Sequence, residues 1–310
     1  MPRNAMPPVT LSVAICTHER SVALAGCLAA LGAPRADIEI IVVDSGSGHA
    51  EAEAIAQVAR RLGAQHIRLA TTGLSAARNA ALATATGTWI AYLDDDAIPA
   101  PDWIAVLLGT IAHNPVLVAT GGPILPRFQS SLPSWWPQSL RAALTIIDDV
   151  CPADPGAADI EPYAANIAFH RDTLIAFGGF PACLGRRGSC LLSNEETYVI
   201  RQFRRAGLLV RFTPELVVHH EITGDRLRPD WLVRRQYWSG LSEAIMLATL
   251  GERRLPKAWR MAIRAVLLAP MLFWPAGSTR HLDRRCAAAF ARGFVRGVLS
   301  EGADHSTFSS

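Results

Sequence analysis

Trp89-Ile-Ala-Tyr-Leu-Asp-Asp-Asp96 is an apolar run that ends in three adjacent carboxylates. A continuous apolar run of this length is typical of a strand that is buried on both faces of a parallel sheet. The pattern occurs twice earlier: residues 11–16 lead into Thr17-His-Glu-Arg20, and residues 38–43 lead into Asp44-Ser-Gly-Ser47. The carboxyl ends of parallel strands form the ligand-binding edge of open α/β sheets. The sequence therefore predicts that the three polar clusters gather at one edge.

Helical patterns separate these strands along the first 120 residues. Ala- and Leu-rich segments predict helices, and two more short apolar runs predict strands; the helices are 21–31, 50–62, 74–85 and 103–113, and the strands 66–69 and 116–120. This alternation predicts an α/β fold with a mostly parallel sheet flanked by helices. Further on, we expect strands at 163–169, 208–212 and 216–219, a helix at 193–206, and a loop-rich flap at 123–162 around Trp135-Trp136.

Length and charge suggest how the chain is divided. It has 310 residues, half of them hydrophobic and 18% charged, with a formal net charge of +3, which is too small to indicate a nucleic-acid partner. Residues 226–296, however, contain 14 Lys and Arg against 4 Asp and Glu. We therefore expect one large α/β domain over residues 1–225, with halves at about 10–122 and 123–225, and a basic helical appendage over 226–310. Such a basic region favours an anionic surface or ligand.

The cysteines, the N-terminus and the apolar stretches of the sequence indicate in which cellular compartment the protein is expected. The six cysteines form no C-x-x-C pair, so we expect reduced thiols in a cytoplasmic protein. The N-terminus lacks the pattern of a signal peptide. No stretch reaches the roughly 18 uncharged apolar residues that a membrane-spanning helix needs.

The carboxylates Asp94-Asp95-Asp96 are the first candidate site. Adjacent carboxylates repel each other, and a divalent cation relieves that repulsion; Mg²⁺ and Mn²⁺ prefer oxygen ligands and often join carboxylates to phosphates. The alternative is a solvated loop whose Asp residues cap the next helix. Asp44 can accept a hydrogen bond from the imide N–H of a uracil ring, or can simply stabilise the turn that follows it.

Three further motifs allow two interpretations each. Arg78, in the helix at 74–85, faces either a diphosphate or solvent. Ser193-Asn-Glu-Glu196 is either a capping box, with Ser193 and Glu196 as its partners, or the position of a general base. One imidazole of His219-His220 either completes a metal shell or is structural.

In this order the motifs resemble those of family-2 glycosyltransferases, which have the GT-A fold. The resemblance covers roughly residues 11–241. It rests on Ser12-Val-Ala-Ile-Cys-Thr-His-Glu-Arg20, Val42-Val-Asp-Ser-Gly-Ser47, Gly73-Leu-Ser-Ala-Ala-Arg-Asn79, Leu93-Asp-Asp-Asp96, Asn166-Ile-Ala-Phe169, Gly178-Gly-Phe180, Glu195-Glu196 and Val217-Val-His-His220.

The resemblance implies a role for each candidate residue. The nucleotide-sugar donor would contact Thr17, Glu19, Arg20, Asp44, Arg78, Asp94 and Asp95. A Mn²⁺ or Mg²⁺ ion would be held by Asp96, Asp94 and His220, with His219 as the alternative to His220. Glu196 would be the catalytic base, with Glu195 as its alternative, because the family usually has Glu-Asp where this chain has Glu195-Glu196.

The implied enzyme is a metal-dependent, inverting transferase that moves a sugar from a nucleotide-sugar donor, expected to be UDP-linked, to a hydroxyl of a glycan or lipid-linked acceptor. Its implied role is in the assembly of cell-surface polysaccharide or glycolipid. A nucleotidyltransferase would need a glycine-rich loop after the first strand, and Cys16-Thr-His-Glu-Arg20 has no glycine. A non-catalytic, membrane-associated scaffold is the alternative from another class, against which the intact carboxylates argue.

Residues 258–274 suggest contact with a membrane. Apolar side chains, with Phe273 and Trp274 at the end, alternate with Lys257, Arg260 and Arg264. This pattern is typical of a helix lying in the headgroup plane of an anionic membrane, which here would be the inner face of the cell membrane. The alternative is that the segment packs against the α/β domain.

Overall fold

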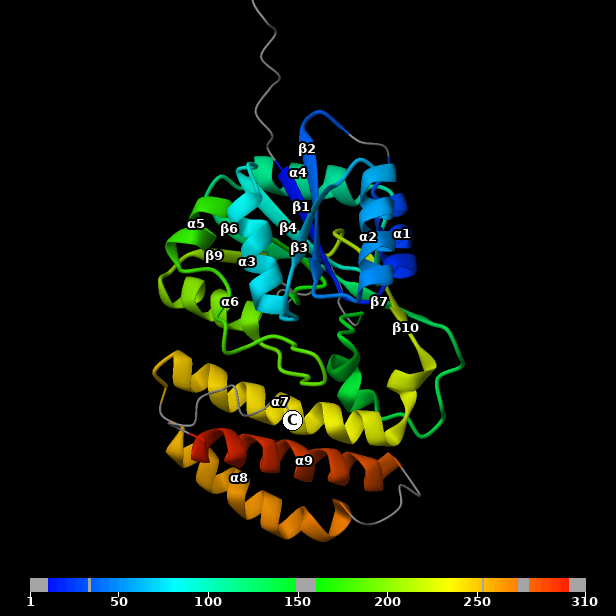
Figure 1. The fold of residues 1–310 in the computed structure, drawn as a ribbon. Coiled ribbons are helices and arrows are strands. Elements are labelled where there is room, and N and C mark those ends of the chain that lie inside the picture. Colours follow the sequence, from blue (N-terminus) through cyan, green and yellow to red (C-terminus); the bar gives the residue numbers. More distant parts are fainter. Residues whose placement is uncertain (1–10, 33–34, 149–159, 253, 273–278, 301–310) are drawn as a thin grey trace, which may run out of the picture. The chain divides into compact units, whose positions relative to one another are not determined.

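The computed structural model describes residues 11–32, 35–148, 160–252, 254–272 and 279–300 (Figure 1). Its strands are β1 (Leu11–Thr17), β2 (Ile38–Ser45), β3 (Gln65–Leu69), β4 (Trp89–Asp94), β5 (Ala97–Pro99), β6 (Leu117–Gly121), β7 (Ile124–Phe128), β8 (Asn166–His170), β9 (Leu209–Phe212) and β10 (Val218–Ile222). Its α-helices are α1 (Ser21–Ala30), α2 (His49–Arg61), α3 (Leu74–Thr84), α4 (Trp103–His113), α5 (Arg171–Ala176), α6 (Glu195–Arg205), α7 (Pro229–Thr249), α8 (Leu255–Leu268) and α9 (Thr279–Leu299). Short 3₁₀ helices are η1 (Gln138–Leu144), η3 (Gly224–Leu227) and η4 (Ala269–Leu272).

The chain forms two compact units. The first contains the residues up to Pro126 together with Ile147–Phe180 and Val199–Glu221. The second contains Arg127–Ile146, Pro181–Tyr198 and the residues from Ile222 onward.

The first unit is built on a seven-stranded sheet in the order β3-β2-β1-β4-β8-β6-β9. Strands β3, β2, β1 and β4 are parallel, and β8 runs antiparallel to β4 and β6. A three-stranded sheet, in the order β5-β10-β7, accompanies it. The expected mostly parallel α/β sheet with flanking helices is confirmed, whereas the sequence did not predict β5, β7 or the second sheet.

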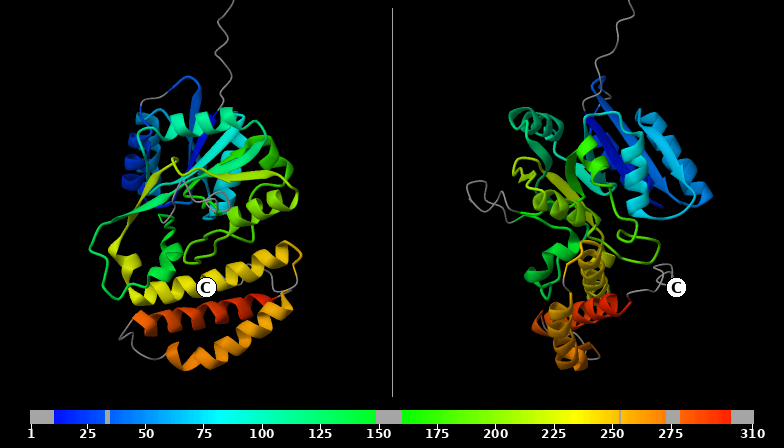
Figure 2. Two further views of the ribbon diagram at one scale, coloured as in Figure 1. Left: turned by 180° about the vertical axis from the view of Figure 1, so that it is seen from behind. Right: turned by 90° about the vertical axis from the view of Figure 1, so that its left-hand side faces the viewer.

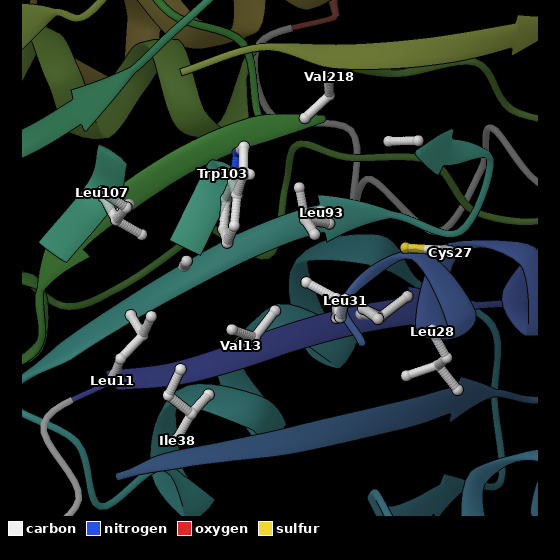
Figure 3. Close-up of a cluster of buried hydrophobic side chains, with 14 of the residues drawn as sticks. Leu11, Val13, Cys27, Leu28, Leu31, Ile38, Leu93, Trp103, Leu107 and Val218 are labelled. Carbon is white, nitrogen blue, oxygen red and sulfur yellow. The ribbon is translucent and has the colours of Figure 1, made fainter. Parts of the chain in front are cut away.

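Alternate residues of the central strands face the two sides of the sheet, and both sides are buried. Leu11 and Val13 of β1 face a core that also contains Leu28 of α1 and Trp103 and Leu107 of α4 (Figure 3). On the other side, Tyr92 packs edge-to-face against aromatic rings, which are Phe169 and Phe180. This burial explains why the strands have no polar face in the sequence.

The turn at Gly178 and Gly179 is fixed by Asn79 of α3. Asn79 Nδ2 donates to the Phe180 carbonyl (2.8 Å), and its Oδ1 accepts from Phe180 N (2.9 Å). Gly179 has a φ of +67°, and a Cβ there would lie 2.6 Å from Asn79 Oδ1, so only glycine fits. The turn expected from Gly178-Gly-Phe180 is therefore present, and it places Phe180 in the aromatic cluster.

The second unit contains the helices α7, α8 and α9, which lie side by side in both views of Figure 2. Gly240 and Gly293 allow the backbones of α7 and α9 to touch, because a Cβ at either residue would collide with a carbonyl of the facing helix. Among the described residues, no helix is long and apolar enough to cross a membrane. The expected C-terminal helical region is confirmed.

The expected flap around Trp135-Trp136 needs correction at Trp136. That side chain is buried in an apolar cluster with Leu232 of α7 and Leu282 of α9, so it anchors its segment within the second unit. Residues 149–159 of the expected flap lie outside the described residues, as do Phe273 and Trp274 of the expected membrane segment.

Candidate functional site

Three strand ends of the first unit meet at one edge of the sheet. In the parallel pairing of β1 with β2, Thr17 lies opposite Asp44. In the pairing of β1 with β4, Cys16 lies opposite Asp94. The polar residues that follow the three strands therefore share this edge, as the sequence predicted.

Arg20 connects two of the three adjacent carboxylates. Its Nη1 lies 3.0 Å from Asp95 Oδ1 and 2.8 Å from Asp96 Oδ2. Thr17 Oγ1 donates a hydrogen bond of 2.8 Å to Asp95 Oδ2. Asp95 and Asp96 are buried, so the alternative of a solvated capping loop is wrong for them. Asp94 keeps about a third of its side chain exposed, at 33%.

His220 of β10 completes this arrangement. Its Nε2 lies 3.1 Å from Asp96 Oδ1, and the ring is buried. The antiparallel pairing of β10 with β5 brings His220 opposite Ala97, and Glu221 N donates to the Asp96 carbonyl (2.9 Å). Neighbouring residues of a strand face opposite sides. His220, and not His219, is therefore the residue in contact with Asp96.

The donor atoms here fit a metal that arrives together with a phosphate ligand. Among the described residues, no three His, Cys, Asp or Glu side chains are close enough to enclose an ion. Asp96 and His220 nevertheless offer an oxygen and a nitrogen 3.1 Å apart, and the side chain of Asp94, two residues before Asp96, is 33% exposed. Mg²⁺ is commonly held by one or two carboxylates, with phosphate and water oxygens completing its shell. The protein would supply only part of the coordination.

Within the described structure, one carboxylate oxygen of Asp44 accepts no hydrogen bond. The side chain is fully buried, and its Oδ1 accepts from Ser47 N (3.0 Å), which matches the expected turn chemistry. Its Oδ2 makes no hydrogen bond within the described structure. Because an unsatisfied buried acceptor costs free energy, a ligand N–H at this atom would be favourable.

Arg68 is a candidate residue that the sequence analysis missed. Its Nε lies 3.7 Å from Asp44 Oδ2, and its Nη2 donates to the Ser47 carbonyl (3.1 Å). The available signal was the position of Arg68 in β3, opposite Asp44 in the β2–β3 pairing. That signal appears only once the register of the two strands is known.

Arg78 is buried in α3, so the alternative of a solvated helix face is wrong. Its Nη2 lies 3.2 Å from Asp94 Oδ1, and its guanidinium carbon lies 5.8 Å from the centre of the Phe180 ring. Tyr92 Oη donates to the Arg78 carbonyl (3.1 Å). These contacts hold a cationic side chain next to the exposed carboxylate of Asp94.

Glu19 connects the loops that follow β1 and β2. Its backbone has a φ of +57°, its N–H donates to Ser47 Oγ (2.9 Å), and its carboxylate accepts from Gly48 N. The geometry thus assigns Glu19 a supporting contact between two loops of the site. Its predicted contact with a donor stays a prediction.

Glu195 and Glu196 belong to the second unit and are both buried at the start of α6. Asn194, with a φ of +73°, directly precedes the helix, and Ser193 Oγ donates to Asn194 Oδ1 (3.1 Å). Ser193 is therefore one residue too early for the alternative capping box. Arg235 of α7 holds this segment by donating to the Leu191 carbonyl (3.1 Å).

The match to a family model agrees with this geometry. The model for glycosyl transferase family 2 matches residues 12–189, which include the β1, β2 and β4 strand ends. The chain belongs to glycosyl transferase family 2. The resemblance found in the sequence is thereby confirmed, and with it the expectation of a glycosyltransferase at the level of the family.

Two relatives that are similar to this chain in sequence are informative. Glucosyl-dolichyl phosphate glucuronosyltransferase of Haloferax volcanii is 32% identical over 175 residues, which cover 56% of each chain. Succinoglycan biosynthesis protein ExoM of Rhizobium meliloti is 27% identical over 320 residues, 95% of each chain. The chain thus spans about half the length of the Haloferax protein and nearly all of ExoM.

A solved structure supports the fold along most of the chain. The mannosyltransferase PcManGT from Pyrobaculum calidifontis, in complex with GDP-Man and Mn²⁺, has a TM-score of 0.63 at 20% identity, covering 97% of this chain and 91% of that one. The GT-A fold expected for this transferase is therefore confirmed.

Asp95 gives the transferase a pH-dependent stability. Burial, together with the Asp96 carboxylate, raises the pKa of Asp95 from its ordinary 3.8 to about 6, although Arg20 and the Thr17 hydroxyl act in the opposite direction. The folded protein therefore binds this proton more tightly than the unfolded chain does. The resulting stabilisation is fully present below pH 4 and is lost as the pH rises through 6.

In the absence of nucleotide and metal, we expect the deprotonation of Asp95 to lower the unfolding free energy by roughly 2–3 kcal/mol as the pH rises from 4 to 7. Urea unfolding of the wild type and of Asp95→Asn at both pH values measures the contribution of Asp95 together with its interaction with Asp96, because groups that do not interact with Asp95 titrate equally in the two proteins. The fall in stability from pH 4 to pH 7 should be smaller in the variant. Equal falls would contradict the assignment.

Proposed function

We propose that this protein is a metal-dependent, inverting glycosyltransferase that moves a sugar from a UDP-linked donor to an acceptor hydroxyl. The observation that carries the proposal is the shared sheet edge, where the open acceptor of Asp44 lies at the end of β2, and the Arg78–Asp94 and Asp96–His220 pairs lie at the end of β4 and directly after it. In this proposal Asp44 binds the nucleobase, Arg78 lies near the diphosphate, and Asp96 and His220 bind the metal.

The acceptor pattern of Asp44 supports a uridine donor. Its Oδ1 is already used by Ser47 N, which leaves Oδ2 for the ligand. Uracil presents one imide N–H at its pairing edge, whereas guanine presents an N–H and an amino group side by side and so needs two acceptors. Asp44 with one open oxygen matches uracil better. Arg68, 3.7 Å from that oxygen, supplies a donor for a neighbouring carbonyl of the base.

Asp96 and His220 are the proposed metal-binding side chains, with the partly exposed side chain of Asp94 contributing. The proposed ion is Mn²⁺ or Mg²⁺, and when bound it neutralises the charge that develops on the departing diphosphate. Arg78 is held beside Asp94 and adds a second positive charge on the same edge. Arg20 keeps Asp95 and Asp96 together, so it orients the carboxylates.

Glu196 is the proposed general base, with Glu195 as its alternative. The carboxylate takes the proton from the acceptor hydroxyl as the oxygen bonds to the anomeric carbon. In the same displacement the bond from that carbon to the diphosphate oxygen breaks, and UDP leaves with the electron pair. Attack from the face opposite the leaving group inverts the anomeric configuration.

The acceptor is proposed to be a glycan or a lipid-linked sugar in the assembly of cell-surface polysaccharide or glycolipid. The names of the two sequence relatives support this class, since one concerns succinoglycan biosynthesis and the other a dolichyl phosphate sugar. We propose a cytoplasmic enzyme that works at the inner face of the cell membrane.

A screen of nucleotides and nucleotide sugars tests the donor and the metal together. We expect UDP and a UDP-sugar to raise the unfolding temperature in the presence of Mn²⁺ or Mg²⁺, and to do so much less in EDTA, because ligands that bind only the folded state stabilise it. GDP should protect less. Equal protection by GDP and UDP, or protection that is independent of metal, would contradict the corresponding part of the proposal.

Asp44→Asn provides the control for base recognition in the same screen. Asparagine keeps the shape, but its amide can present a donor where Oδ2 accepts. The advantage of UDP over GDP should therefore shrink by about tenfold or more, the effect of leaving a buried polar group mismatched. Metal dependence should be unchanged, because Asp44 is not among the proposed metal ligands.

A further inference from the structure

The helix α8 of the second unit presents apolar side chains to solvent. None of its 14 residues is buried. Its large exposed side chains form a stripe along one face: Leu255 (75%), Trp259 (73%), Ile263 (48%), Val266 (74%) and Leu267 (72%). A surface helix normally turns such a stripe toward the core. Exposed apolar patches of this kind mark sites of interaction.

The other side of α8 is the one that packs within the unit. Ala258 and Met261 contact the cluster formed by Ala244 and Leu247 of α7 and Phe294 of α9. The contact of Lys257 Nζ with Glu243 Oε1 (2.8 Å) fixes the same side. The helix is therefore anchored through small and flexible side chains while its largest rings and branched chains remain outside. The alternative that these apolar residues pack against the α/β domain does not hold for the five exposed ones.

A basic groove adjoins the apolar stripe. It has a volume of about 480 Å³ and lies between α8 and α9, lined by Arg260, Ile263, Arg264, Leu267, Leu268, Asp283, Arg284 and Ala287. Three of these residues are arginines, and Asp283, the one acidic residue, accepts a hydrogen bond from Ser139 (3.0 Å). Within the described residues no ion pair is recorded for Arg260, Arg264 or Arg284. The groove thus combines apolar walls with positive charge.

We propose that the exposed face of α8, together with this groove, is the surface by which the protein docks on a bilayer containing anionic lipids. The stripe would enter the boundary between headgroups and acyl chains, where Trp is favoured because its ring is apolar and its N–H is polar. Arg260, Arg264 and Arg284 would meet lipid phosphates beside it. The inference deepens the proposed function and rests on it for one point, that the acceptor is held by the same bilayer.

Charge favours a membrane over a second copy of this chain as the occupant. The helix α8 has no acidic residue, and Arg260 and Arg264 line the groove beside its apolar stripe. Pairing two such faces about a two-fold axis would bring like charges together. An anionic bilayer, by contrast, complements both the stripe and the groove.

Sedimentation of the full chain with vesicles tests the surface. The vesicles are phosphatidylcholine with increasing fractions of phosphatidylglycerol. We expect Trp259→Gln/Leu267→Gln to weaken binding at least tenfold at every composition, since fully burying one large apolar side chain changes an equilibrium constant by that factor or more. The matched control, Val116→Gln/Ile175→Gln, changes two exposed apolar residues of the first unit and should bind as the wild type does.

A second pair of variants tests the contribution of the arginines to membrane binding. Arg260→Gln/Arg264→Gln should weaken binding to anionic vesicles by about 25-fold at low salt, about fivefold for each charge, and far less at high salt. The control Arg60→Gln/Arg61→Gln removes the same charge from exposed positions on α2 and should have a small effect. Circular dichroism verifies that every variant is folded.

Three results would overturn the inference. The first is binding that the α8 variants and their controls reduce equally. The second is the absence of binding by the wild type. The third is an oligomer, seen by light scattering, that Trp259→Gln/Leu267→Gln converts to a monomer without changing vesicle binding. Binding of UDP with Mn²⁺, measured without vesicles, reports on the proposed function independently, so that either proposal can fail alone.

Discussion

Glu196→Gln is expected to lower sugar transfer by about 10²- to 10⁴-fold, the contribution of a positioned general base. Gln keeps the length and shape of the side chain but cannot take a proton from the acceptor hydroxyl. Glu196 is buried at the first turn of α6, where the positive end of the helix stabilises a carboxylate. The variant should therefore fold, with a stability loss of about 1 kcal/mol or less from this lost interaction.

The affinity of the Glu196 variant for the nucleotide shows whether Glu196 acts as the general base or has a structural role. Calorimetry should give Glu196→Gln the same affinity for UDP with Mn²⁺ as the wild type, because the base acts on the acceptor. Glu195→Gln tests the neighbouring position under the same conditions, and Glu53→Gln, an exposed position on α2, is the matched control. If Glu195→Gln abolishes transfer and Glu196→Gln retains it, the base is Glu195. If all three variants are active, neither glutamate is the base.

The strands of the sheet could be predicted because their signal is local. The apolar runs before Thr17, Asp44 and Asp94 became β1, β2 and β4, and the helix expected at 103–113 has these same bounds as α4 (Trp103–His113). A strand buried on both faces must be apolar along its whole length, so a short window of sequence contains the information. The common edge of the polar clusters then follows from parallel pairing.

The contacts within the site could not be predicted, because they join residues far apart in the chain. Arg20 meets Asp95 and Asp96 across about 75 positions, and His220 meets Asp96 across more than a hundred. The contact between His220 and Asp96 depends on the short strand β5, whose three residues are too few to give a periodic signal. The motif gave both His219 and His220 as candidates, whereas the β5–β10 pairing places His220 in contact with Asp96.

The orientation of α8 is a further property that the sequence left undecided. Its apolar and basic residues alternate with a helical period, which suits both an interfacial helix and a packed one. The structure distinguishes these two kinds of helix, because Met261 packs against the neighbouring helices while Trp259 is exposed to solvent. Such a choice depends on the shape of α7 and α9, which no pattern within α8 encodes.

Asp96→Asn is expected to lower transfer by at least 10²-fold. The carboxylate lies 3.1 Å from His220 Nε2 and is the proposed oxygen ligand of the metal. Stabilisation of a leaving group by a metal contributes several kcal/mol, and each 1.4 kcal/mol corresponds to a tenfold change in rate. Because Asp96 is buried and paired with Arg20, we also expect the unfolding free energy to fall, by about 1–3 kcal/mol. Asp102→Asn, an exposed position before α4, is the matched control.

The dependence of transfer on Mn²⁺ concentration separates the loss of a metal ligand from a loss of packing. If Asp96 binds the ion, the residual activity of Asp96→Asn should require a higher Mn²⁺ concentration for half-saturation, and UDP should lose most of its metal-dependent protection against unfolding. A side chain that only supports Arg20 and His220 would instead reduce stability and leave the Mn²⁺ requirement unchanged. Near-normal turnover, or an unaltered Mn²⁺ requirement at reduced turnover, would therefore remove Asp96 from the metal site and leave it as a partner of Arg20.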